Sequence, residues 1–191
     1  RDRLAIPMIY VSHQYDEILR LATSLVLMRE GSVVAQGTVS ELSHSPQLRP
    51  LVGSDLTGTV IDARAMALDD SGLMRVGVGS GELRLPAGGC IVGQALRLHL
   101  LARDVIIATG PWTASSIRNC IAGTMAGSEQ EPPASALTSR DVGAGQQLMA
   151  RSPPAATKAL GLHLGQSVWA MIKAAALQGH SFAAPATRHE L

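Results

Sequence analysis

Aromatic residues and lysines are scarce in this chain. Its 191 residues include two Trp, two Tyr and one Phe, and its only lysines are Lys158 and Lys173. Basic and acidic residues nearly cancel, with 16 Lys and Arg against 15 Asp and Glu. Proteins that bind nucleic acid usually carry a basic excess or aromatic platforms on which bases stack. The composition therefore argues against a nucleic-acid partner.

Cysteine and long apolar runs are also scarce. Cys90 and Cys120 are too few for a disulfide framework and lack C-x-x-C spacing, so we expect reduced core thiols and a cytoplasmic setting. The histidines other than His13 have no close paired spacing with cysteine or carboxylates, which argues against a zinc site. No apolar run reaches the roughly 18 residues that span a bilayer. Any membrane contact is expected to go through a partner protein.

What is present is the composition of a globular protein, 46% hydrophobic and 16% charged. The length suits one large domain or two small ones, and we expect two. The chain opens on Arg1-Asp2-Arg3 and runs directly into apolar residues, so we expect it to begin within a domain.

The N-terminal residues alternate strand and helix patterns. Residues 8–12 form an apolar run typical of a buried strand, and residues 14–22 carry apolar side chains at helical spacing. A polar turn then separates the apolar runs 24–28 and 33–35, which predicts a hairpin.

A capping box and prolines mark the end of this part. Thr38 begins a short helix with Glu41 three residues later, and the prolines that follow predict a linker at 44–51. From residue 52 the pattern changes to short β-rich segments broken by glycine, which predicts a small barrel.

An internal repeat organises the β region. Three segments of the first copy, 58–60, 81–85 and 93–102, match 123–125, 146–150 and 165–174 of the second. The second copy carries an insertion at 153–161 that predicts a short helix after a proline pair. Its strand at 136–142 is poorly patterned, because residues 138–141 are polar throughout, so we expect weak order there. From residue 179 the chain lacks periodicity, and we expect a frayed tail.

His13 lies where a predicted strand meets a predicted helix, in Ser12-His13-Gln14-x-Asp16-Glu17. Such positions often bind phosphate in open α/β sheets, although an ordinary histidine beside a capping serine fits the pattern too. The longer run 6–42 resembles the switch-histidine region of ABC transporter ATPases. The resemblance implies that His13 senses the γ-phosphate of ATP, with Mg²⁺, in a complete ATPase.

This chain is not expected to hydrolyse ATP alone. A P-loop needs a glycine-rich turn ending in Gly-Lys, whose backbone N–H groups and ammonium hold the phosphates. Lys158 follows Thr157 and Lys173 follows Ile172, so neither belongs to a P-loop. The signature loop of the family is missing as well.

A second group of polar residues lies in segment 115–124, between the two copies of the repeat. It combines hydroxyls, a guanidinium and an amide, which are donors that suit a tetrahedral dianion. A surface ion pair and an ordinary turn explain the same residues. Ser116-x-Arg118-Asn119-x-x-x-Gly123-Thr124 and the later run 165–174 together resemble the molybdate-binding Mop unit found in TOBE domains.

The resemblance implies an oxyanion site made of five residues: Ser116, Arg118, Asn119, Lys173 and Ala174. An ammonium within an apolar strand needs an anionic or polar partner, or it extends to water. Ala175 and Ala176 stand where relatives usually carry a hydroxyl residue, which removes a donor. The first copy lacks an equivalent lysine.

The predicted fold is mainly β, with paired Mop/TOBE (OB-like) β-barrel units preceded by an α/β remnant of an ABC nucleotide-binding domain. The predicted boundaries are 1–43 for the remnant, 44–51 for the linker, 52–178 for the oxyanion-binding domain and 179–191 for a flexible tail. We expect exposed apolar surface on the remnant, because its strands lack their sheet neighbours.

The resemblance implies the C-terminal part of the ATP-binding subunit of a molybdate importer, whose β region binds molybdate or tungstate as an accessory or regulatory domain. The implied partners are a second copy in a homodimer and a membrane permease, which would hold the complete subunit at the cytoplasmic membrane. Two alternatives stay open. One is a β domain that only dimerises, and the other is a molybdate-responsive regulator or storage protein, which residues 6–37 oppose.

Overall fold

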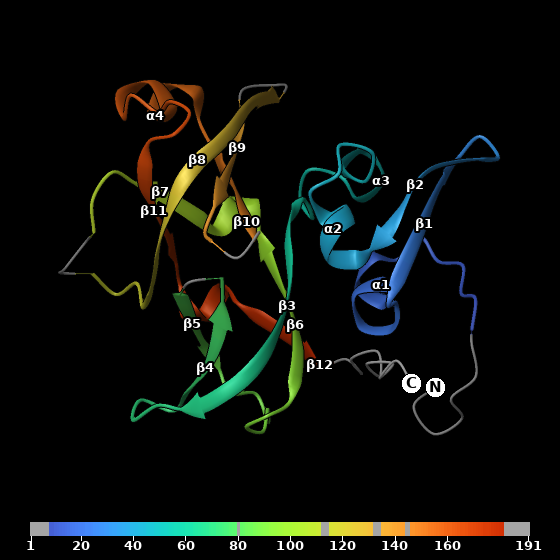
Figure 1. The fold of residues 1–191 in the computed structure, drawn as a ribbon, viewed down its shortest axis with the longest axis horizontal. Helices are drawn as coiled ribbons and strands as arrows, with labels where there is room; N and C mark the ends of the chain where they lie inside the picture. The colour runs from blue at the N-terminus through green and yellow to red at the C-terminus, as the bar shows by residue number, and fades with distance from the viewer. Residues whose placement is uncertain (1–7, 80, 112–114, 132–134, 144–145, 182–191) are drawn as a thin grey trace, which may run out of the picture.

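The computed structural model describes residues 8–79, 81–111, 115–131, 135–143 and 146–181. Within these residues, short helices and one hairpin precede two five-stranded antiparallel sheets (Figure 1). The prediction of a mainly β fold with paired units is confirmed. None of the helices in the described part of the chain is long and apolar enough to span a membrane.

The N-terminal part contains the elements α1 (Tyr15–Leu21), β1 (Ser24–Arg29), β2 (Ser32–Thr38), α2 (Val39–Ser43) and α3 (Arg49–Val52). The predicted helix and hairpin are confirmed, since β1 pairs antiparallel with β2. The capping box is confirmed too, because Thr38 Oγ1 accepts from the Glu41 backbone N–H at 3.2 Å and Glu41 Oε2 accepts from the Thr38 backbone N–H at 2.8 Å. Helix α3 lies partly within the expected linker.

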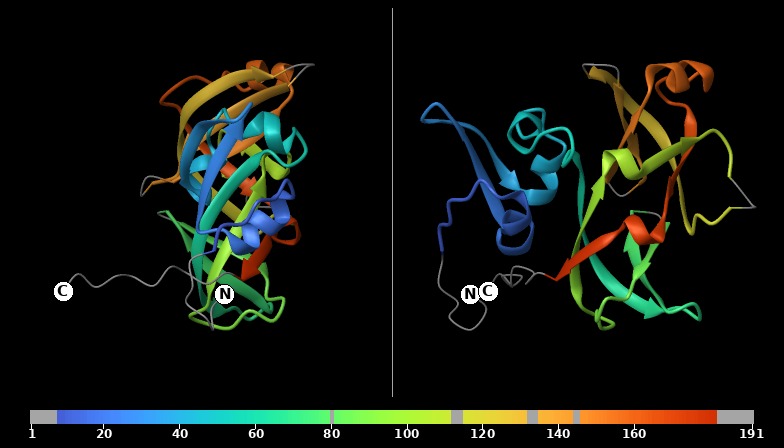
Figure 2. Two further views of the ribbon diagram at one scale, coloured as in Figure 1. Left: turned by 90° about the vertical axis from the view of Figure 1, so that its right-hand side faces the viewer. Right: turned by 180° about the vertical axis from the view of Figure 1, so that it is seen from behind.

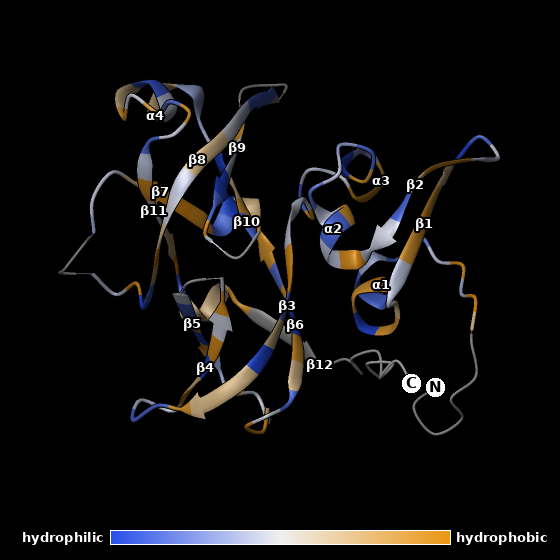
Figure 3. Cartoon of the chain, in the orientation of Figure 1, coloured by the Kyte–Doolittle hydropathy of each residue, from blue (hydrophilic) through white to orange (hydrophobic). Residues whose placement is uncertain are grey.

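The strand predicted at 8–12 does not form. These residues are in no sheet, and Ile9 and Val11 are 97% and 92% exposed. The hairpin sheet has only two strands, so the apolar run has no described strand to pair with. Val26 and Val33 on the hairpin are also more than half exposed, and Figure 3 colours much of β1 and β2 hydrophobic. The expected exposed apolar surface is confirmed.

The first sheet has the order β12-β6-β3-β4-β5. Its strands are β3 (Gly58–Leu68), β4 (Leu73–Val78), β5 (Gly81–Pro86), β6 (Ala95–Leu101) and β12 (Gln178–Ser181). The second sheet has the order β10-β9-β8-β11-β7. Its strands are β7 (Val105–Ala108), β8 (Asn119–Glu131), β9 (Ser135–Asp141), β10 (Gln147–Ser152) and β11 (Ser167–Ile172).

The two sheets exchange their last strands. After β6, the 3-10 turn η1 (Ala102–Asp104) leads into β7, which pairs with β11 of the second sheet. After β11, the turn η2 (Ala174–Ala176) leads into β12, which pairs with β6 of the first sheet. The red C-terminal strand can be followed to the first sheet in Figure 2. Residues 179–181 therefore belong to a strand, and the rest of the expected tail lies outside the described residues.

The backbone pairing corrects one part of the predicted repeat. Ala65 and Met125 make the same contact in their sheets, donating to Gln94 O at 2.9 Å and to Gln166 O at 3.0 Å. Counting back along β3 and β8 from these two residues, Gly58 corresponds to Arg118 and not to Gly123. The other two segment matches are confirmed by the pairing of β5, β6, β10 and β11.

The weak order expected at 136–142 is wrong. Strand β9 pairs with both β8 and β10, and two of its polar residues are buried. Thr138 is fully buried and donates its hydroxyl to Ala150 O at 3.2 Å. Arg140 is also fully buried, and none of its side-chain nitrogens has a hydrogen-bond partner among the described residues. A polarity pattern could not reveal a strand that faces polar side chains inward.

Of two smaller predictions, one is confirmed and one is partly wrong. The insertion forms α4 (Pro154–Ala159), which confirms the predicted helix. Both cysteines are free thiols, but Cys120 is exposed because it alternates with buried Ile121 along β8. The expectation that both lie in the core is therefore wrong for Cys120.

One continuous core joins the two sheets, and a second lies under the N-terminal helices and includes Val60 of β3. Arg97 of β6 ties the N-terminal part to the first sheet. Its Nη1 donates to Leu19 O at 3.1 Å and to Ala22 O at 2.6 Å, and its Nε donates to Asp62 Oδ1 at 2.7 Å. These carbonyls lie at the end of α1, where a cation is electrostatically favoured.

Candidate functional site

Asn119 is the first residue of β8, and its side chain joins the two sheets. Its Oδ1 accepts from the Arg84 backbone N–H at 2.6 Å, and its Nδ2 donates to Arg84 O at 2.9 Å. The amide thus imitates a peptide group and satisfies both backbone groups of one β5 residue. Because Asn119 is only 1% exposed, these bonds fix the start of β8 against β5.

Arg84 and Arg118 lie on either side of this contact. The Arg118 side chain is exposed, and its carbonyl accepts from Arg84 Nη1 at 3.4 Å. Arg84 Nε also lies 3.3 Å from Asp69 Oδ2. Hydrogen bonds from Ser71, followed by smaller contributions that include the charge of Arg84, hold the pKa of Asp69 below its ordinary value. The Arg84 guanidinium therefore bridges a carboxylate and the segment that carries Arg118.

Lys173 and Ala174 reach the same place from β11. Ile172 pairs with Asn119 in the register between β11 and β8, so Lys173 follows directly at the end of the ladder, opposite Arg118. Its side chain is exposed. Ala174 begins η2, and this turn contacts β5. The fold thus brings four of the five predicted residues to one junction between the sheets.

Ser116 lies three residues before Asn119 in the connection that enters β8, and it is exposed. Within the described part of the chain its hydroxyl makes no hydrogen bond to the other four predicted residues, whereas the neighbouring Ser115 Oγ accepts from the Ile117 backbone N–H at 3.2 Å. The junction therefore carries three cationic residues, Arg84, Arg118 and Lys173, of which Arg84 is paired with Asp69. Guanidinium and ammonium groups are the donors that suit a tetrahedral dianion.

Sequence reasoning missed Arg84. The residue lies in the first copy of the repeat, whereas the predicted site residues lie in the second and at its boundary. A signal was present, because the residue lies in segment 81–85, which the repeat had already marked as a strand. What the sequence did not contain was the packing of β5 against β8.

His13 is not one of the residues at this junction. It is exposed and precedes α1, which packs on β6 and β12 of the first sheet. Its neighbour Ser12 donates to Glu17 Oε2 at 2.8 Å and accepts from the Gln14 backbone N–H at 3.0 Å. Hydrogen bonds from Tyr10 and Ser12 lower the pKa of Glu17. The described residues thus show a capped turn around His13.

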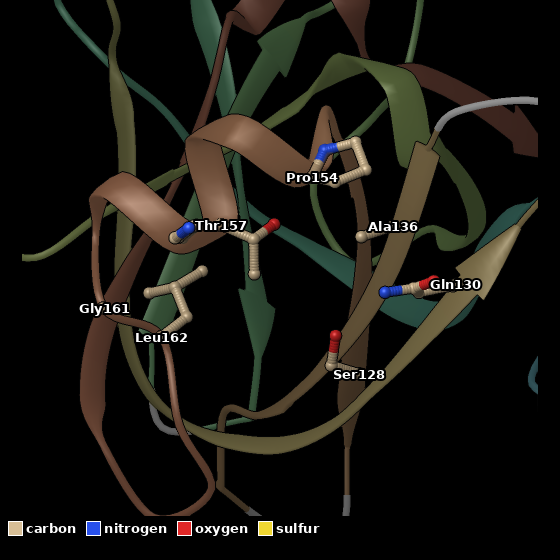
Figure 4. Close-up of a pocket in the computed structure, with 8 residues that line it drawn as sticks. Ser128, Gln130, Ala136, Pro154, Thr157, Gly161 and Leu162 are labelled. Atoms are coloured by element: carbon tan, nitrogen blue, oxygen red, sulfur yellow. The ribbon is translucent and has the colours of Figure 1, made fainter.

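Two surface hollows lie elsewhere. One of about 480 Å³ lies between α4 and the strands β8 and β9, and is lined by Ser128, Gln130, Thr157 and Lys158 among others (Figure 4). Another of about 470 Å³ lies against β8, β9 and β11, beside Thr124 and Trp169. Neither includes a predicted site residue. Within the described ranges no three His, Cys, Asp or Glu side chains are grouped to hold a metal ion.

Comparison with known proteins agrees with this architecture. The TOBE domain family matches residues 115–178. The molybdenum import ATP-binding protein ModC of Methylococcus capsulatus is 38% identical over 92% of this chain and 49% of its own length. The ModC protein of Albidiferax ferrireducens is 34% identical over 94% of this chain and 48% of its own. The chain thus spans about half the length of these relatives.

A solved structure supports the fold. The cytoplasmic molybdate-binding protein ModG, in a crystal form with molybdate bound, superposes with a TM-score of 0.58 at 21% sequence identity. The match covers 64% of this chain and 95% of ModG.

Proposed function

Because this chain belongs to the family of molybdenum import ATP-binding proteins and matches the part that carries the TOBE domain, we propose that its β region binds a tetrahedral oxyanion. The ligand is molybdate or tungstate, and the domain is an accessory or regulatory part of an importer's ATP-binding subunit. The observation that supports the proposal is that Arg118 and Lys173 directly adjoin Asn119 and Ile172, the last pair in the ladder of β8 and β11, at the junction fixed by Asn119 and Arg84.

The proposed mechanism of binding follows from charge and rigidity. Arg118 supplies a planar fork of donors, Lys173 supplies a compact charge, and the backbone turn at Ala174 lies beside them. Asn119 acts as a positioning residue, because both ends of its amide already hold Arg84. Arg84 is paired with the Asp69 carboxylate, and its bond to the Arg118 carbonyl restrains that segment. An anion there would neutralise groups drawn from both sheets.

The N-terminal part has its own proposed role. His13 acts as the switch histidine only in a complete subunit, where ATP and Mg²⁺ would be held by other segments. The exposed apolar side chains of residues 8–11 and of the hairpin support this proposal, because they form the kind of surface that a larger domain covers. The proposed partners are a membrane permease and a second copy of the subunit, at the cytoplasmic face of the membrane.

A dimerisation domain without a ligand is the second candidate. Two observations favour it: Asn119 has both ends of its amide engaged, and Ala175 and Ala176 provide no hydroxyl. In that case the cationic residues would contact a partner's carboxylates rather than an oxyanion.

Calorimetric titration of the whole chain with molybdate, tungstate and sulfate tests the proposal. Arg118→Ala and Lys173→Ala should each weaken molybdate binding roughly tenfold or more, since each removes a charged hydrogen-bond donor. Lys158→Ala is the matched control, because it removes the other lysine, which is exposed on α4. Equal heat for sulfate and molybdate would contradict selectivity for molybdate or tungstate, and no heat from folded protein would contradict oxyanion binding. Loss of a dimer in Arg118→Ala without any binding would favour the second candidate.

A further inference from the structure

The sheets meet at two junctions that the internal repeat relates to each other. At one, β5 meets β8 and η2, and at the other, β10 meets β3 and η1. The polar junction consists of Arg84, Arg118, Asn119, Lys173 and Ala174. The residues at the equivalent positions of the other one, here named the apolar junction, are Met149, Gly58, Thr59, Leu101 and Ala102.

Apolar side chains fill the second junction. Met149 and Ala102 are 2% and 0% exposed, and they pack with Leu137 into a small core of their own. Lys173, at the position equivalent to Leu101, is exposed, and Ala174 is half-buried. The apolar junction therefore has neither the charge nor the solvent access that an anion requires.

Gly58 closes the position that Arg118 occupies at the polar junction. A Cβ on Gly58 would lie 2.2 Å from Leu100 O, so no side chain fits there without moving the backbone. The backbone pairing also extends one residue further at the apolar junction than at the polar junction. Gly58 pairs with Leu101, and the Ala102 backbone N–H donates to Thr57 O at 3.0 Å.

The polar junction is more open at the corresponding point. Strand β8 begins only at Asn119, so Arg118 lies outside the ladder. Among the described residues, no hydrogen bond joins Ala174 to Ile117 in the way that Ala102 joins Thr57. The chain before β8 therefore diverges from β11 and leaves the cationic side chains exposed. At the apolar junction, Thr59 Oγ1 accepts from the Met149 backbone N–H at 2.9 Å and closes the contact.

We propose that each chain binds a single oxyanion, at the polar junction, and that the apolar junction is a permanent contact that holds the two sheets together. This inference rests on the proposed function. The repeat creates two equivalent positions, and Gly58 and Met149 have converted one of them into core.

Equilibrium dialysis of the whole chain against molybdate, with molybdenum counted by elemental analysis, tests the inference. We expect one molybdenum per chain at saturation. At a free molybdate concentration that just saturates the wild-type protein, Arg118→Ala should bind well under one molybdenum per chain. Leu101→Met is the matched control, since it changes the position equivalent to Lys173 with little change in volume, and it should still bind one. Unfolding curves of each variant identify any loss that is due to misfolding.

Each outcome has a distinct meaning. Two molybdenum atoms per chain, or binding by Arg118→Ala equal to that of the wild-type protein, would overturn the inference and leave oxyanion binding intact. A value of one half per chain would mean one anion for each pair of chains and would also overturn it. No bound molybdenum in folded wild-type protein would overturn the inference and the proposed function together.

Discussion

The two sheets have the same internal strand order, but they fill equivalent interior positions with different chemistry. Val76 of β4 pairs with Leu83, and Arg140 of β9 pairs with Leu148 at the equivalent place. Both side chains are fully buried, yet one is aliphatic and the other is a guanidinium that has no hydrogen-bond partner in the described part of the chain. The backbone ladder therefore sets the fold of each copy, while the side chains inside it have been free to diverge.

The strongest test of this difference concerns Gly58 and its counterpart Arg118. Gly58→Ala should lower the free energy of unfolding by about 3 kcal/mol or more, because its Cβ would collide with a backbone oxygen. Arg118→Ala should change it by less than about 0.5 kcal/mol, since that side chain is exposed. Urea unfolding of both variants measures the effect. Equal stabilities would show that the two junctions are interchangeable.

The next largest effect concerns the attachment of α1, which packs on β6 and β12 of the first sheet. Arg97→Leu should cost roughly 3 kcal/mol, because it leaves Leu19 O and Ala22 O without their buried donor. Limited proteolysis should then cut within residues 8–43 before it cuts either sheet. Arg103→Leu is the control, because that half-exposed side chain makes only a loose ion pair with Asp55. Unchanged protection of residues 8–43 would contradict the role given to Arg97.

Replacing the equivalent interior residues should change the stability of the protein in opposite directions in the two sheets. Arg140→Leu should stabilise the protein by about 2 kcal/mol, since it removes a buried charge without a partner. Val76→Arg should destabilise it by a larger amount. Thermal unfolding measures both changes, and a destabilised Arg140→Leu would show that the guanidinium has an essential partner.

Alkaline pH gives an independent check on Arg140. Burial lowers the pKa of Arg140 to about 10, below the ordinary value that the unfolded chain keeps. Between these values the unfolded state binds more protons, so the free energy of unfolding gains a contribution that rises with pH. Relative to Arg140→Leu, the wild-type protein should therefore become more stable as the pH increases through about 10. A constant difference would contradict the lowered pKa.

The smallest expected effect is the difference in stability cost between replacing Asn119 and replacing Thr59, whose side chains join the two sheets. Asn119→Ala should cost roughly 2 kcal/mol, because it leaves two backbone groups of Arg84 without partners. Thr59→Ala should cost about 1 kcal/mol, because it removes only the bond to the Met149 backbone N–H. Chemical unfolding of the two single variants and the double variant measures these costs. A larger loss of stability in Thr59→Ala than in Asn119→Ala would show that the apolar junction depends more on its side-chain hydrogen bond than the polar junction does.

Local features of the fold could be predicted from the sequence because they depend on neighbours in the chain. The capping box at Thr38 and the helix of the insertion are of this kind. The strand predicted at residues 8–12 failed because a strand also needs a partner, and apolar periodicity does not supply one. The strand at β9 was underestimated because Thr138 and Arg140 face inward.

The candidate site was predictable only in part, for the same reason. The family resemblance indicated Arg118 and Lys173, and the register of β8 and β11 brings them together. Arg84 was missed because its contact with Asn119 depends on the packing of two sheets. The match of Gly58 to Gly123 misled because both glycines permit close backbone approach, to Leu100 O and to Asp141 O. Two glycines at positions that are not equivalent can therefore resemble a repeat in the sequence.

The exchange of β7 and β12 makes this part of the chain an intramolecular dimer. A half-chain that ended after β7 would expose one strand with no sheet of its own and one sheet edge with no strand. Two such halves would satisfy each other only at high concentration, whereas the connection between them here supplies a large effective concentration. The sheets should therefore unfold together, and a cut in the connection between β7 and β8 should leave two fragments that stay bound to each other.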